Sequence, residues 1–192
     1  MSPLVSGGYP VKADEWLLNG QPSGLFRSTM ARRGMGSDVA AALTTQVMLS
    51  VAVPLEPGDV VTSLSFLSGA TAASVPTNWW FALYSNAATP ALLAQSADQT
   101  TGAWAADTLK TLALATPQLI SAAGVYYAAI MVKATTPPSL LCSVLARAGA
   151  AGALLTGQKV LAQTSGSALT TTAPATIASP TTVVNLPYAV AT

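Results

Sequence analysis

The chain has 192 residues, no histidine and one cysteine, and its eight basic and seven acidic side chains make up 8% of the sequence. An ordinary soluble domain is about a quarter charged, so groups for acid–base, nucleophilic or metal chemistry are scarce and an enzyme is not expected. The net charge of +1 provides no field that would attract nucleic acid. With 51% hydrophobic residues, the composition is typical of a protein that packs against copies of itself or against a larger assembly.

Residues 1–43 form a distinct segment that is rich in glycine and has no sustained periodicity. We interpret it as an extended arm with isolated large apolar residues and one arginine pair. Its candidate anchors are Tyr9, Trp16, Leu25, Phe26, Arg32 and Arg33. Spaced anchors of this kind order either by docking on a partner or by wrapping their own domain, and both alternatives stay open.

An apolar stretch at residues 39–53 follows the arginine pair, which is an arrangement found in export signals. The stretch is shorter than the roughly 20 residues of a spanning helix, and a polar Thr-Thr-Gln run interrupts it. Its later residues alternate between apolar and weaker side chains. We therefore interpret it as a β-strand and expect no membrane insertion.

From residue 44 the hydrophobic period is two, which is the period of a strand with one buried face. Turn formers such as Pro57–Gly58 separate the alternating runs. The expected strands are 46–53, 60–67, 78–84, 92–95, 107–115, 117–120, 125–133 and 140–147. Short strands at this spacing predict an all-β domain over residues 44–147, an antiparallel β-sandwich that is jelly-roll-like.

Residues 148–192 are rich in serine, threonine and alanine and have few charges. Segments that stay disordered in water usually carry more charge. We therefore expect a C-terminal extension with short strands, near 159–162 and 183–184, that packs on the sandwich or on a neighbouring subunit.

Two adjacent tryptophans, Trp79 and Trp80, lie in the strand expected at 78–84. Successive strand residues point to opposite faces of a sheet, so the two indoles lie on opposite sides. Aromatic residues are enriched in cores and interfaces, which favours a core position for one indole and an interface position for the other. The alternative is a binding platform.

The loop at 96–107 is the one candidate ligand site, because Asp98 and Asp107 bracket Trp104 there. The two carboxylates could act as a glycosidase acid/base pair, or they could cap backbone amides at the loop edges, which is the favoured interpretation. An exposed indole with aspartate oxygens could also bind a sugar or a calcium ion. No metal or cofactor site is expected, since the other carboxylates are scattered.

The single cysteine, Cys142, lies in the apolar run 140–144. A buried small hydrophobic residue is the usual role of such a cysteine. Without a histidine to activate it, a catalytic thiol is not expected.

Four stretches of the expected sandwich share their pattern with a known group of proteins. They are 57–66, 78–84, 92–98 and 124–132, which begin with Pro57, Asn78, Leu92 and Gly124. In pattern and residue texture, residues 44–147 resemble β-sandwich modules in virion proteins of tailed phages that infect actinobacteria. Such modules occur in capsid decoration proteins, head fibres and minor tail proteins, and the resemblance brings no catalytic residues with it.

The resemblance implies a non-enzymatic virion protein on the exterior of the particle, as capsid decoration or cement or as a head fibre. We expect a homotrimer, assembled in the host cytoplasm, whose arm attaches it to the major capsid or tail proteins. The alternative is a tail-associated module that binds a receptor or a host-surface glycan through the 96–107 loop.

Overall fold

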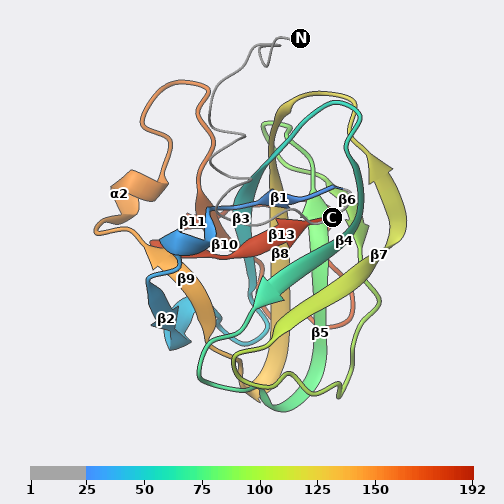
Figure 1. Ribbon diagram of the computed structural model, residues 1–192, viewed down its shortest axis with the longest axis vertical. Coiled ribbons are helices and arrows are strands. Elements are labelled where there is room, and N and C mark those ends of the chain that lie inside the picture. The colour runs from blue at the N-terminus through green and yellow to red at the C-terminus, as the bar shows by residue number, and fades with distance from the viewer. Residues whose placement is uncertain (1–24) are drawn as a thin grey trace, which may run out of the picture.

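A computed structural model describes residues 25–192 (Figure 1). Antiparallel strands dominate this part of the chain, and the predicted all-β antiparallel sandwich is confirmed. The helical elements are short: η1 (Arg32–Gly34), η2 (Ala40–Ala42) and α2 (Ala148–Ala151). Among residues 25–192, no helix combines the length and apolar character needed to cross a membrane.

The larger sheet has six strands in the order β11-β10-β3-β8-β5-β6. These strands are β11 (Thr181–Thr182), β10 (Ala162–Ser165), β3 (Met48–Leu55), β8 (Gly124–Thr136), β5 (Ser74–Tyr84) and β6 (Leu92–Gln95). The two longest, β5 and β8, lie side by side, with Phe81 opposite Ile130. Both strands bury residues on their two faces, which requires a layer of protein on each side of the sheet.

A second sheet has the strand order β1-β13-β4-β7, and a small third sheet has the order β12-β9-β2. The second sheet comprises β1 (Arg27–Ser28), β13 (Ala189–Ala191), β4 (Val60–Leu67) and β7 (Leu109–Leu119). The third comprises β12 (Asn185–Pro187), β9 (Leu140–Val144) and β2 (Ser37–Val39). Strands from residues 25–43 and from residues 148–192 therefore complete the same sheets as residues 44–147.

The expected stretches 107–115 and 117–120 lie largely in one strand, β7, and Pro117 does not interrupt it. β7 is at the end of the four-stranded sheet. Proline lacks a backbone N–H and is tolerated on such an edge strand. The register shift between Val61 and Ser63 in the partner strand accommodates the irregularity at this end of the pair.

The core lies between the six-stranded and four-stranded sheets. Phe66 of β4 and Phe81 of β5 contact each other across it, with 4.8 Å between their ring centroids. Trp79 belongs to the same cluster. Burying apolar side chains of this size is the main favourable term in folding.

The outer face of the six-stranded sheet has its own cover, residues 166–180, which we call the cover segment. Trp80 and Tyr84 are fully buried under it. Trp80 Nε1 donates a hydrogen bond to the Thr170 carbonyl at 2.7 Å, and Tyr84 Oη donates to the Pro174 carbonyl at 2.8 Å. The interface position expected for the second tryptophan is therefore wrong, because the chain itself covers Trp80.

Candidate functional site

Asp98 holds the conformation of the 96–107 loop. Its carboxylate accepts hydrogen bonds from Nδ2 of Asn78 at 2.7 Å and from the backbone N–H of Trp79 at 2.9 Å. The Thr100 N–H donates to the same carboxylate at 3.3 Å. Asp98 thus satisfies donors from β5 and from its own loop, which is the role of an aspartate that caps a turn.

Trp104 points inward and is 1% exposed. Its ring stacks on Trp79 with 5.2 Å between centroids and meets Phe81 nearly edge-on at 5.7 Å. Its Nε1 donates to the Thr108 carbonyl at 3.0 Å. A sugar stacks on an open ring face, so the expectation of an exposed Trp104 is wrong.

The partner of Trp104 in this stack comes from another strand, and for this reason the loop sequence alone did not reveal the burial. One signal was available, because Trp104 is the only large apolar residue among small ones in the stretch 97–106. An isolated large residue of this kind anchors a loop to the core by burying its apolar area.

Asp107 is exposed at the other end of the loop and has a φ of 50°. Aspartate is among the residues that tolerate this left-handed backbone. The Asp107 N–H donates to the Gly69 carbonyl at 2.8 Å, which ties the loop to the neighbouring turn. Within residues 25–192, no three histidine, cysteine, aspartate or glutamate side chains gather in a way that could hold a metal ion.

The predicted anchors of the arm fall into two groups. Tyr9 and Trp16 lie outside the described residues. Leu25 packs against the sandwich core and Phe26 is partly buried, whereas the Arg32–Arg33 pair is exposed in η1.

Residues 25–43 contact their own domain. Arg27 forms a bidentate ion pair with Asp59, in which Nε and Nη2 donate to the two carboxylate oxygens at 2.9 and 2.8 Å. β1 pairs with β13, and β2 pairs with β9. Of the two alternatives for the arm, these residues show wrapping of the arm's own domain, and docking by the preceding residues stays a prediction.

Asp38 connects β2 to the turn after β4. Its carboxylate accepts the Ala70 N–H at 2.8 Å. Hydrogen bonds from the Ser139 hydroxyl and from Ala70 lower the pKa of the Asp38 carboxyl below its ordinary value. A Cβ at Gly69 would clash with the Asp38 carboxylate, so a larger residue there would displace this carboxylate from its bond to the turn.

Cys142 on β9 is fully buried, and its Sγ donates to the Leu140 carbonyl at 3.3 Å. Burial, together with the nearby negative charge of Asp38, raises the pKa of the thiol to about 12. The thiol is neutral at ordinary pH and therefore unreactive. The expected role of a buried small hydrophobic residue is confirmed.

The outward side of β7, which lies at the edge of the sandwich (Figure 1), is exposed and uncharged. We call it the β7 face. It consists of Leu109, Thr111, Ala113 and Ala115, and it ends at the cross-strand pair Val60–Leu119. Leu109 is 51% exposed and Leu119 is 71% exposed. The alternation along the strand predicted that Leu109, Thr111 and Ala113 share one side, but it did not predict that this side is exposed.

Comparison with known proteins identifies no family. No protein-family model matches the chain. A search of curated proteins finds no significant match. The argument for function therefore depends on the fold and on the surfaces described above.

Proposed function

We propose that the protein is a non-enzymatic structural protein that assembles on the exterior of a phage virion, as a capsid decoration or cement protein or as a head fibre. The β7 face is the observation that supports this proposal most directly. It combines exposed leucines with small and hydroxyl-bearing side chains and carries no charge. The centres of protein interfaces are depleted in charged residues in the same way, and exposed apolar patches mark interaction sites.

The use of charge in the fold agrees with a structural role. Asp98 caps the donors of a loop, Asp59 pairs with Arg27, and Asp38 bonds to the turn at Ala70. Each of these groups holds two parts of the chain together. The chain thus uses much of its scarce charge to build a rigid body.

The virion setting comes from the resemblance of residues 44–147 to sandwich modules of phage particles. In this setting, several copies, most simply three, pack through uncharged surfaces, and the arm residues before Leu25 attach the body to the major capsid or tail proteins. The gain is stability from buried area and from multiple attachment points. No reaction is involved.

Quantitative mass spectrometry of purified particles of the phage that encodes this chain tests the proposal. We expect the chain in a fixed ratio to the major capsid or tail protein. A variant that lacks residues 1–24 should keep its fold, as measured by near-ultraviolet circular dichroism, and should no longer co-sediment with particles. Absence of the chain from purified particles would contradict the virion assignment.

The alternative function, a receptor- or carbohydrate-binding tail module, loses its main argument. That argument required an open indole face at Trp104, and this ring is buried against Trp79 and Phe81. We therefore expect a glycan array to show no binding that depends on the 96–107 loop.

A further inference from the structure

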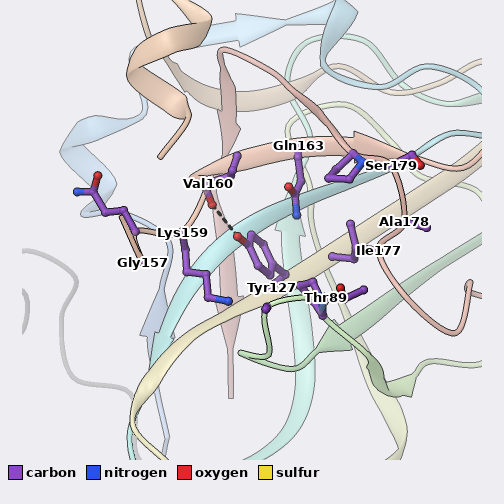
Figure 2. Close-up of a pocket in the computed structure, with 13 residues that line it drawn as sticks. Thr89, Tyr127, Gly157, Lys159, Val160, Gln163, Ile177, Ala178 and Ser179 are labelled. Carbon is purple, nitrogen blue, oxygen red and sulfur yellow. Dashed lines mark hydrogen bonds between the residues drawn. The ribbon is translucent and has the colours of Figure 1, made fainter. Parts of the chain in front are cut away.

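The cover segment leaves part of the outer face of the six-stranded sheet open, and a pocket of about 580 Å³ lies there (Figure 2). Three stretches form its walls, 88–90, 157–160 and 177–180, and the sheet contributes Tyr127 and Gln163. The volume is in the range of about 300–1,000 Å³ that is typical of binding pockets.

Gln163 on β10 is the unusual residue of this pocket. It is 3% exposed, and its side chain lines the pocket (Figure 2). Its backbone carbonyl accepts a hydrogen bond from Ser50 Oγ at 3.3 Å, but its side-chain amide forms no hydrogen bond with any described residue. The polar atoms of this amide are open to the pocket, because among the described residues only Ser165 Oγ is a fully buried side-chain N or O atom without a hydrogen-bond partner. The amide offers two donors and one acceptor to an occupant of the pocket.

The other walls of the pocket are mostly apolar. Tyr127 Oη donates to the Val160 carbonyl at 2.9 Å, so its hydroxyl is satisfied and its ring faces the space (Figure 2). Ile177 and the two prolines at 90 and 180 add further apolar surface. The one cation, Lys159, donates from Nζ to the Ala87 carbonyl. These walls suit apolar side chains, and the Gln163 amide suits a peptide group.

The chain presents a matching element next to the pocket. Leu154 and Leu155 are 70% and 72% exposed, in a loop that projects from the sandwich between α2 and β10 (Figure 1). Gln158 Oε1 accepts the N–H groups of Leu154 and Leu155 at 2.9 and 3.0 Å, and the Gln158 N–H donates to the Leu155 carbonyl at 3.0 Å. This leucine tip is held in a fixed turn, so little conformational freedom is lost when it binds.

We infer that the pocket binds the Leu154–Leu155 tip of a second copy of the chain. Both leucines remain exposed although residues 157–160 of the same loop line the pocket, so they do not fill the pocket of their own copy. Both elements lack acidic groups and have complementary chemistry: two apolar side chains and a peptide backbone meet apolar walls and an unpaired amide. Because tip and pocket are neighbours in the chain, their exchange between copies can close as a pair or as a small ring. The inference does not depend on the virion setting.

Cross-linking between two differently tagged copies tests the inference. One copy carries Leu155→Cys, the other carries Ser179→Cys, and a short bismaleimide reagent joins cysteines that come close. Cys142 does not compete, because it is fully buried. We expect a cross-linked product that contains both tags, at least tenfold above the product formed by a Leu119→Cys copy. Leu119 is the matched control, since it is equally exposed but lies on β7.

A pocket-filling variant provides the second measurement. Ala178→Trp in the Ser179→Cys copy should lower the cross-linking yield at least tenfold, whereas Thr101→Trp, at an exposed position of the 96–107 loop, should leave it unchanged. A yield for Leu155→Cys no higher than that for Leu119→Cys, or a yield insensitive to Ala178→Trp, would overturn the inference. Absence of the chain from virions would contradict the proposed function but would not affect the cross-linking result.

Discussion

The outer surfaces of the two main sheets differ in how far the rest of the chain covers them. On the six-stranded sheet, the outward side chains are large and aromatic, among them Trp80 and Tyr84, and the cover segment buries them. On the four-stranded sheet, the β7 face carries smaller side chains and leucines at its ends, and it remains exposed. The chain thus covers the aromatic side of the six-stranded sheet and leaves the β7 face of the four-stranded sheet exposed.

The cover segment has little regular secondary structure, so side chains of the sheet satisfy much of its backbone. Trp80 and Tyr84 donate to two of its carbonyls. Gln95 donates to the Thr171 carbonyl at 3.1 Å and accepts the Ala173 N–H at 2.7 Å. Buried backbone groups need such partners. The side-chain polar atoms of Trp80, Tyr84 and Gln95 are thus placed to bond to the backbone of the cover segment.

The largest expected effect on stability comes from removing a large side chain that the cover segment buries. Trp80→Ala removes a fully buried indole and its bond to Thr170, and we expect a loss of about 3–5 kcal/mol in the free energy of unfolding. Urea denaturation measures it. Ala113→Ser, on the β7 face, is the matched control and should change stability by less than about 0.5 kcal/mol, because Ala113 is exposed. Equal losses for the two variants would contradict the comparison.

A smaller effect is expected from loosening the cover while leaving the aromatic residues in place. Gln95→Ala removes two hydrogen bonds to the cover segment, and we expect a loss of about 1–3 kcal/mol. Limited proteolysis should show faster cleavage within residues 166–180. Gln118→Ala serves as the control, because the side chain of Gln118 bonds, among the described residues, only to the nearby Thr116 carbonyl. Unchanged cleavage in Gln95→Ala would show that the cover does not depend on these bonds.

The third prediction concerns the pH dependence of stability at Asp38, which joins β2 to the turn at Ala70. The pKa of Asp38 is lower in the folded protein than the ordinary value of 3.8. Its contribution to stability is therefore present above the unfolded pKa and is lost as the pH falls through the folded pKa. We expect Asp38→Asn to show a weaker loss of stability than the native chain between pH 5 and pH 2, measured by thermal unfolding. An identical acid profile would argue against this role.

The smallest effect on folding is expected on the open surface. Leu109→Ser should change the free energy of unfolding by less than about 0.5 kcal/mol, because Leu109 is half exposed in the isolated chain. Self-association should nevertheless weaken, since the leucine supplies apolar area to the proposed contact. Thermal unfolding and sedimentation velocity measure the two effects. A large loss of stability with unchanged self-association would show that Leu109 stabilises the fold and does not contribute to a contact between copies.

The sequence predicted the regular part of the fold well. β4 and β6 occupy the expected residues, 60–67 and 92–95, because alternation marks their faces and turn formers mark their ends. The short strands β10 and β13 were harder to predict from the sequence. They are defined by pairing with β3 and β4, far away in the chain, and their own residues are small or polar. Such strands follow from tertiary context more than from local pattern.

The surfaces were harder to predict than the strands. The period of two placed Trp79 and Trp80 on opposite sides of β5, but only the structure shows that one stacks on Trp104 and that the cover segment buries the other. The local sequence around a tryptophan in a loop, or around an aromatic side chain on a strand, does not show whether another protein or a distant part of the same chain covers it. Burial depends on where distant segments pack.

Sedimentation equilibrium of the full-length chain over a wide concentration range tests the central claim that uncharged surfaces of this body assemble. The chain has a mass of 19.3 kDa. We expect the measured mass to rise with concentration to a small whole multiple of this value, with little dependence on salt, because the contacts carry few charges. A mass that stays at that of one chain up to the highest concentration would contradict the account.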